Sequence, residues 1–140
     1  MISILITQSL SFSNETLSFK SCQKGSIFNI ISANLIHSPK FPGDQVKFSL
    51  DLELFGRVID PIIEIQLYKL RTPDVRYRQK LCNLNLMNCP SHFAEFVYGT
   101  SFTIPSNLQR GRYRLRVLFL EDHQKVGCYE SQLKVGNNFH

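Results

Sequence analysis

Between residues 45 and 54, apolar and polar side chains alternate without a break, and this pattern limits the possible folds most. The segment reads Gln-Val-Lys-Phe-Ser-Leu-Asp-Leu-Glu-Leu. Successive side chains of a strand point to opposite faces of a sheet, whereas a helix would spread this pattern around its circumference. The segment therefore predicts a half-buried β-strand. Its inward side chains are Val46, Phe48, Leu50, Leu52 and Leu54.

Shorter alternating segments extend the β prediction over most of the chain. The inward side chains are Ile63, Ile65 and Leu67 in residues 62–70, and Tyr113, Leu115, Val117 and Phe119 in residues 112–120. The other expected strands cover residues 26–36, 93–98, 101–104 and 126–135. Turn signals such as Pro42-Gly43 and Arg110-Gly111 separate these segments. About seven short strands at this spacing predict an all-β fold, an immunoglobulin-like two-sheet sandwich or a barrel.

The four cysteines are Cys22, Cys82, Cys89 and Cys128. Four cysteines allow three connectivities, and the sequence alone does not choose among them. Their order favours a nested pairing, with a short loop from Cys82 to Cys89 and a long one from Cys22 to Cys128. A disulfide that closes about 100 residues contributes about 4 to 5 kcal/mol in the loop-entropy model. Free thiols in a cytosolic protein are the alternative.

The N-terminal segment differs from the rest of the chain. The apolar run at residues 2–6 has no basic residue before it and is shorter than the apolar part of a signal peptide. We interpret residues 1–17 as a signal-peptide remnant or a disordered segment, residues 18–136 as the domain and residues 137–140 as a tail. Asn14 begins an Asn-Glu-Thr acceptor for N-glycosylation, which favours a secreted protein.

Basic residues give the chain a formal net charge of +5. They gather before Cys82 and in the segment after Arg110: Arg71, Arg76, Arg78 and Lys80, then Arg110, Arg112, Arg114 and Arg116. Anionic surfaces would attract them, and protonation of His37, His92 and His123 in an acidic compartment would strengthen the attraction. A merely solvated strand face is the alternative. We expect no nucleic-acid partner, because Tyr113 and Phe119 alternate onto the face opposite the arginines.

Motifs of catalysis and metal binding are missing from the sequence. It contains no Gly-x-Ser-x-Gly elbow, phosphate loop, dinucleotide fingerprint or His-Glu-x-x-His pair. Cys82, Cys89 and His92 lack a fourth zinc ligand at a familiar spacing. We therefore expect no enzyme, no cofactor and no metal site.

An ordered series of short elements resembles the MD-2-related lipid-recognition (ML) family, and within it the GM2 activator-like proteins. The matching elements lie at residues 18–22, 42–46, 61–69, 89–90, 104–105, 111–114, 126–128 and 133–136. The chain departs from the activators in its short stretch from Leu70 to Leu81, which carries fewer cysteines. The resemblance implies splayed sheets around a lipid cavity, secretion or lysosomal residence, and a carrier of glycolipid or phospholipid. A non-catalytic role as activator of a lysosomal lipid hydrolase is also implied.

Side chains of the predicted inner faces would line such a cavity. They are Phe48, Leu50, Leu52, Leu54, Ile63, Ile65, Leu67, Phe96, Phe102, Leu115, Val117 and Phe119. Each buried methylene of an acyl chain contributes about 0.8 kcal/mol. An ordinary packed core, in an immunoglobulin-like module that recognises another protein, is the alternative.

Three aromatic residues beside expected turns are candidates for transient contact with a membrane surface. Phe41, Phe55 and Tyr98 each lie next to a glycine or a proline-glycine pair at a predicted strand end. Exposed apolar side chains at loop tips could enter a bilayer while a lipid is extracted.

Overall fold

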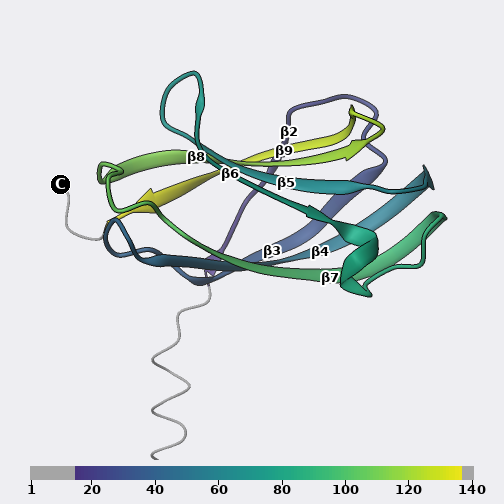
Figure 1. Ribbon diagram of the computed structural model, residues 1–140, viewed down its shortest axis with the longest axis horizontal. Helices are drawn as coiled ribbons and strands as arrows, with labels where there is room; N and C mark the ends of the chain where they lie inside the picture. Colours follow the sequence, from purple (N-terminus) through teal and green to yellow (C-terminus); the bar gives the residue numbers. More distant parts are fainter. Residues whose placement is uncertain (1–14, 137–140) are drawn as a thin grey trace, which may run out of the picture.

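A computed structural model describes residues 15–136, which form two antiparallel sheets packed face to face (Figure 1). Sheet A has the order β1 (Glu15–Thr16), β3 (Phe28–His37), β4 (Gln45–Val58) and β7 (Ser91–Thr103). Sheet B has the order β2 (Lys20–Ser21), β9 (Gln124–Val135), β8 (Gly111–Glu121), β5 (Ile62–Tyr68) and β6 (Pro73–Lys80). A short 3-10 helix, η1 (Leu81–Leu84), follows β6. The predicted all-β, two-sheet sandwich is confirmed.

The inward side chains of β4 are buried as the alternation predicted. Val46, Phe48, Leu50, Leu52 and Leu54 are at most 1 % exposed. The predicted inward residues of β5 and β8 join them in a single hydrophobic cluster between the sheets. Across that interface the rings of Phe28 and Phe119 stack with centroids 4.5 Å apart. Apolar packing of the two inner faces therefore forms the core.

The differences from the predicted strands that affect the site concern β7, β6 and β1. The segments expected at 93–98 and 101–104 form one strand, β7, because Gly99 stays in register opposite Ser49. Strand β6 was not predicted; it is an edge strand with half-buried and exposed residues in alternation. Strand β1 lies within residues 1–17, where it pairs with Asn34 and Leu35. Asn14 and the tail at 137–140 lie outside the described residues.

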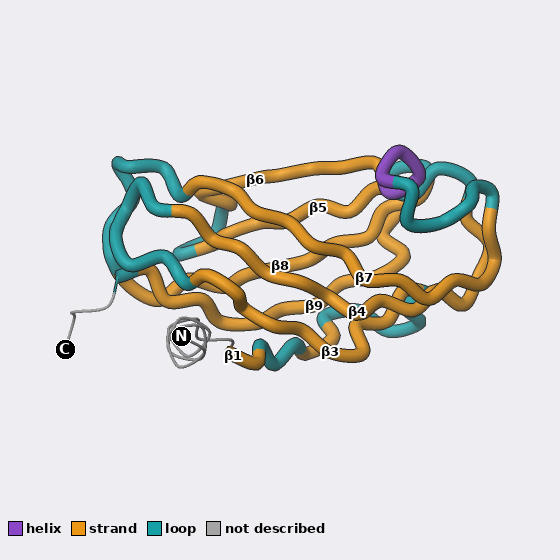
Figure 2. The backbone as a smooth tube through the Cα atoms, turned by 90° about the horizontal axis from the view of Figure 1, so that it is seen from below, coloured by secondary structure: helices purple, strands orange, loops and turns teal. Residues whose placement is uncertain are grey.

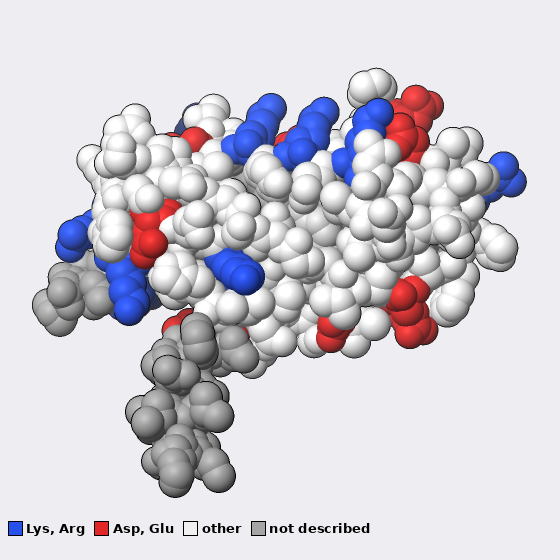
Figure 3. Space-filling model, turned by 60° about the horizontal axis from the view of Figure 1, so that its bottom comes forward, with Lys and Arg blue, Asp and Glu red and all other residues white. Residues whose placement is uncertain are grey.

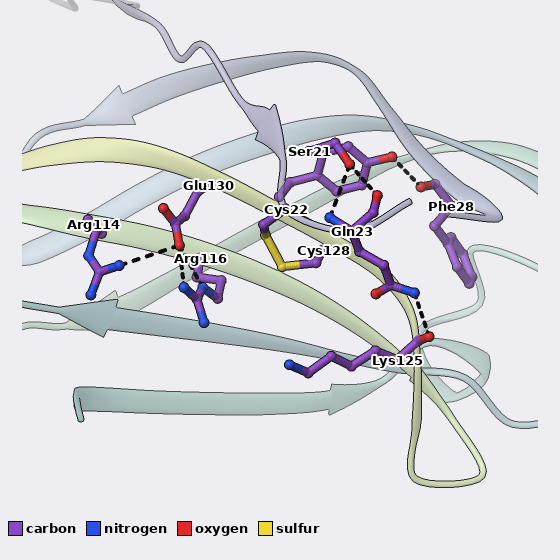
Figure 4. The surroundings of a disulfide bond; sticks show 10 residues. Ser21, Cys22, Gln23, Phe28, Arg114, Arg116, Lys125, Cys128 and Glu130 are labelled. Atoms are coloured by element: carbon purple, nitrogen blue, oxygen red, sulfur yellow. Dashed lines mark hydrogen bonds and ion pairs between the residues drawn. A yellow bond between two sulfur atoms is a disulfide. The ribbon is translucent and has the colours of Figure 1, made fainter. Parts of the chain in front are cut away.

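Both disulfides have the nested pairing that the cysteine order favoured. Cys22 and Cys128 join the end of β2 to β9, with Cα atoms 5.1 Å apart (Figure 4). The Cys22 amide also donates a hydrogen bond of 2.9 Å to the Cys128 carbonyl oxygen. Cys82 and Cys89 close the connection between β6 and β7. Because both sulfurs of that loop are used in a disulfide, they are not thiolate ligands for zinc.

The connections between the sheets are distributed unevenly over the two ends of the sandwich. Residues 22–27, 59–61 and 81–90 cross between the sheets at the end that carries η1, which we call the η1 end. Residues 104–110 cross at the opposite end, beside the loop of residues 38–44, which we call the 38–44 end. In Figure 1 the η1 end is on the right. The η1 end is therefore held by more covalent connections.

Replacement of Gly127 should destabilise the core. A Cβ atom at Gly127 would lie 2.8 Å from Cδ2 of Phe119, whose ring is already stacked on Phe28. We expect Gly127→Ala to lower the free energy of unfolding by about 1 to 3 kcal/mol in urea denaturation, because the ring must leave its packed position.

The matched control is Gly99→Ala, since nothing lies within 4 Å of a Cβ atom at Gly99. It should change the free energy of unfolding by less than about 0.5 kcal/mol. Equal effects of the two replacements would contradict the packing argument.

Candidate functional site

The space between the sheets is lined almost entirely by apolar side chains. Of the residues predicted to line a cavity, all but Phe96 are buried, and Phe96 is half-buried. Among the described residues, the buried polar side chains that point inward are those of Thr100 and Ser131. Glu64 and Gln66 are also buried, but they lie on the outer face of sheet B. The interior therefore offers apolar contact and almost no hydrogen bonds.

The two long sides of the sandwich are closed in different ways. On one side, residues 17–19 carry the chain from β1 in sheet A to β2 in sheet B, next to the Cys22–Cys128 disulfide. On the other side, β6 pairs with β5 and β7 pairs with β4, and within residues 15–136 no ladder joins β6 to β7. Figure 2 shows β6 and β1 along opposite sides. The β6–β7 side therefore depends on side-chain contacts.

A ring stack and a hydrogen bond join β6 to β7 on this side. The Tyr77 ring of β6 stacks on the Phe102 ring of β7, with centroids 6.2 Å apart and an angle of 22° between the ring planes. The Tyr98 hydroxyl donates a hydrogen bond to Oε1 of Gln79. Burial raises the pKa of Tyr98 to about 12, so the hydroxyl stays protonated and remains a donor at physiological pH.

Beside these contacts lies a hollow of about 310 Å³, which we call the β6–β7 mouth. Its lining comes from both sheets: Ile36, Lys47, Phe48, Tyr77, Gln79, Gly99, Thr100 and Ser101. Phe48 is also a member of the buried cluster, so the mouth reaches the side chains of the interior. Sequence reasoning missed this feature because β6 was not predicted as a strand.

Tyr98 corrects one of the predicted membrane contacts. Its side chain is 0 % exposed. The prediction assumed that the strand ends before Gly99, whereas β7 continues to Thr103 and its alternation turns Tyr98 inward opposite Leu50. Tyr98 therefore provides no exposed ring for a bilayer.

Phe41 and Phe55 are half-exposed but lie at opposite ends of the molecule. Phe41 precedes β4 at the 38–44 end and Phe55 lies near its other end. A strand as long as β4 spans about 40 Å, so one flat surface at one end cannot meet both rings. Leu70, 78 % exposed, lies at the same end as Phe41. Phe55 instead packs beside Phe93, with ring centroids 5.6 Å apart.

A second, larger cleft lies on the β1–β2 side. Its volume is about 1060 Å³, and its apolar lining includes Leu17, Leu35 and Leu133. The basic side chains around it are Lys20, Lys40, Arg112, Arg114 and Lys134, and the acidic ones are Glu15 and Glu130. The sequence prediction missed this cleft because it placed residues 1–17 outside the domain.

The described part of the chain contains no group of three or more His, Cys, Asp or Glu side chains placed to hold a metal ion. In the same residues, no helix is long and apolar enough to cross a membrane.

Removal of the Tyr98 hydroxyl should weaken the contact between the sheets. We expect Tyr98→Phe to lower the free energy of unfolding by about 1 kcal/mol in urea, because the bond to Gln79 is lost and the half-buried amide is accessible to water. A double-mutant cycle with Gln79→Ala supplies the control, since the two effects should not add. Additive effects would show that this bond does not contribute to stability.

Comparison with known proteins gives one family match and several structural matches. The ML domain model matches residues 16–135. No curated protein sequence matches the chain. Chicken MD-1, crystallised with lipid IVa, has a TM-score of 0.55 at 14% identity, with 89% of this chain and 98% of that chain covered.

Two further structures share the fold. A Niemann-Pick type C2 protein from the Japanese carpenter ant has a TM-score of 0.52 at 12% identity, covering 87% of this chain and 90% of its own. The C-terminal domain of wzt has a TM-score of 0.57 at 14% identity, covering 91% and 82%. These identities bear on the fold alone, whereas the family model spans nearly all of the described residues. The chain belongs to the ML domain family.

Proposed function

We propose that this protein binds a lipid by taking its acyl chains between the two sheets, and that it carries or presents the lipid without catalysis. One observation carries the proposal: the inner faces are almost entirely apolar, while the edge strands β6 and β7 on one side of the sandwich are joined by side chains and not by a strand ladder. Each methylene that enters contributes about 0.8 kcal/mol. A long acyl chain therefore gains enough to displace side-chain contacts at the edge.

The β6–β7 mouth is the proposed path for the lipid. An acyl chain that enters there has to move the Tyr77 and Phe102 rings apart and break the bond between Tyr98 and Gln79. Those movements break no strand ladder, since β6 and β7 are edge strands. The η1 end is joined by three connections, one of them closed by Cys82 and Cys89, whereas residues 104–110 join the sheets at the 38–44 end, so the sheets would separate more easily at the 38–44 end.

Family and structural likeness support the proposal. The chain belongs to the ML domain family, and MD-1, which has a similar fold, was crystallised with lipid IVa. The sequence resemblance to GM2 activator-like proteins favours a glycolipid or phospholipid as ligand and a lysosomal lipid hydrolase as partner. The two disulfides fit an oxidising compartment, which agrees with a secreted or lysosomal protein and with glycosylation at Asn14.

Native mass spectrometry of the protein secreted from a eukaryotic host tests lipid binding directly. We expect a bound species of defined mass that organic extraction removes, together with two intact disulfides. We also expect uptake of a fluorescent fatty-acyl probe. A lipid-free protein that takes up neither an acyl nor a ganglioside probe would contradict the proposal.

The same probe tests the path. Tyr77→Ala should speed uptake several-fold, because it removes the ring that stacks on Phe102 at the mouth. Thr103→Ala is the matched control, since Thr103 lies on the same side of the sandwich but its side chain is exposed on the outer face of β7. If Tyr77→Ala binds the probe but takes it up at the same rate as the parent protein, the lipid enters by another path, for example at the larger cleft.

Contact with a membrane should depend on the 38–44 end. We expect Phe41→Ser to reduce co-sedimentation with phospholipid vesicles about tenfold, because the exposed ring lies at the end where the mouth opens and its transfer from water contributes about 1.5 kcal/mol or more. Phe55→Ser, equally exposed at the η1 end, is the matched control. Equal losses in both variants would contradict this orientation.

A second candidate function is recognition of another protein by the outer face of sheet A. Phe55, Phe93 and Val97 are each more than half exposed, and the first two pack against each other. Contiguous exposed apolar side chains mark interaction sites. This candidate predicts a lipid-free protein and a pull-down partner that is lost in Phe93→Ser.

A further inference from the structure

The outer face of sheet B carries two parallel rows of cationic side chains. The β6 row consists of Arg76, Arg78 and Lys80, and the β8 row consists of Arg112, Arg114 and Arg116. Strand β5 runs between them, with Gln66 opposite both Arg76 and Arg116. At this level two strand spacings separate Arg76 from Arg116 by about 10 Å, and successive cations along each row are about 7 Å apart. From there the β6 row continues toward the η1 end and the β8 row toward the 38–44 end, so the two rows are staggered. We call these six residues the cationic rows.

Several of these side chains are fixed in place before any ligand arrives. Nη2 of Arg78 lies 2.6 Å from Oε1 of Glu64. Arg114 and Arg116 both reach Glu130, as Figure 4 shows. Their guanidinium groups also lie 5.1 and 4.7 Å from the centroid of the Tyr68 ring. A ligand that binds these groups therefore orders few side chains, and less conformational entropy is lost.

Nζ of Lys80 also lies 3.6 Å from Oδ2 of Asp60. The six cations therefore face three carboxylates, those of Glu64, Glu130 and Asp60, and positive charge remains on this face. The Glu64 carboxylate is 3 % exposed beneath the arginines, whereas the side chains of Arg76, Arg78 and Lys80 are 62, 54 and 55 % exposed. Sheet A has the opposite character, since Asp51, Glu53 and Glu95 lie on or beside its outer face. Figure 3 shows blue side chains along the upper rim, with red ones beside them at its right end and further red ones along the lower edge. An anionic ligand is therefore attracted to one face of the molecule.

The chemistry of this face favours a sulfated polymer over a bilayer or a nucleic acid. Among residues 15–136, the large exposed apolar side chains lie on sheet A or in loops, and the rows themselves carry none. The nearest is Leu70 in the β5–β6 loop, whose carbonyl oxygen accepts a hydrogen bond of 2.7 Å from Nη2 of Arg114. Tyr68 is 9 % exposed beneath Arg114 and Arg116, so it cannot stack on a base. Guanidinium groups instead bind planar or tetrahedral oxyanions through paired hydrogen bonds.

We propose that the cationic rows bind a sulfated polysaccharide chain, which lies along β6 and β8 on the outer face of sheet B. This site is separate from the proposed lipid site, because that site lies between the sheets. The protein can therefore bind a sulfated glycan with or without a lipid in its interior.

Binding to a fluorescent heparin oligosaccharide tests the proposal. The variant Arg76→Gln/Arg112→Gln removes one exposed cation from each row and keeps Arg78, the closest ion-pair partner of the buried Glu64 carboxylate. We expect heparin to bind about tenfold more weakly. The matched control is Lys24→Gln/Arg57→Gln, which removes the same charge from exposed positions outside the rows and should bind heparin like the parent. Thermal unfolding of both variants checks that they are folded.

Three further probes identify the source of the anionic groups. Hyaluronan, which has carboxylates but no sulfates, should bind at least tenfold more weakly than heparin. Any binding of duplex DNA or phosphatidylserine vesicles should be weakened equally by the row variant, Arg76→Gln/Arg112→Gln, and by the control variant, Lys24→Gln/Arg57→Gln. Equal loss of heparin binding in both variants would overturn the proposal, because net charge alone would then explain it. DNA or vesicles that bind as tightly as heparin and lose binding in the row variant would also overturn it.

Discussion

Apolar contact between the inner faces of the two sheets is the interaction on which the rest of the structure depends. In the described residues no strand belongs to both sheets, so side chains and the connecting segments hold the layers together. The Phe28–Phe119 stack and the inward residues of β4 supply much of this contact. Apolar attraction is non-directional. The contacts that hold the two sheets together are therefore of the same kind that an acyl chain would make.

The covalent connections decide where the layers can separate. At the η1 end, three connections link the sheets, and the Cys82–Cys89 disulfide closes one of them. On the β1–β2 side, residues 17–19 cross between the sheets beside the Cys22–Cys128 disulfide. On the β6–β7 side near the 38–44 end, the Tyr77–Phe102 stack and the bond from Tyr98 to Gln79 join the two edge strands, and residues 104–110 link β7 to β8. Opening is least costly where the fewest covalent and backbone bonds resist it.

Alternation of apolar and polar residues in the sequence correctly predicted which side chains of the central strands are buried. It failed for edge strands, where the position of a side chain depends on pairing with a neighbouring strand. β4 combines strict alternation with complete burial, so its inward face could be read directly. β6 was missed because an edge strand buries only one side partially, and its alternating residues are mostly charged or polar. Tyr98 was misplaced because Gly99 looked like a strand end, although pairing with β4 carries the strand past it. The mouth, which lies where β6 and β7 face each other, was therefore not predictable.

The cationic rows require charged side chains, whereas the proposed lipid site behind the mouth requires apolar ones. The fold places the two sets on opposite faces of sheet B. Polar groups on the interior would weaken acyl binding, because buried charge is unfavourable unless it is paired. Strand geometry sends Tyr113, Leu115 and Val117 inward and Arg112, Arg114 and Arg116 outward along the same eleven-residue strand. One strand therefore serves an apolar interior and a cationic surface at once. A protein held by its outer face on an anionic polymer would still keep its 38–44 end free to meet a lipid surface.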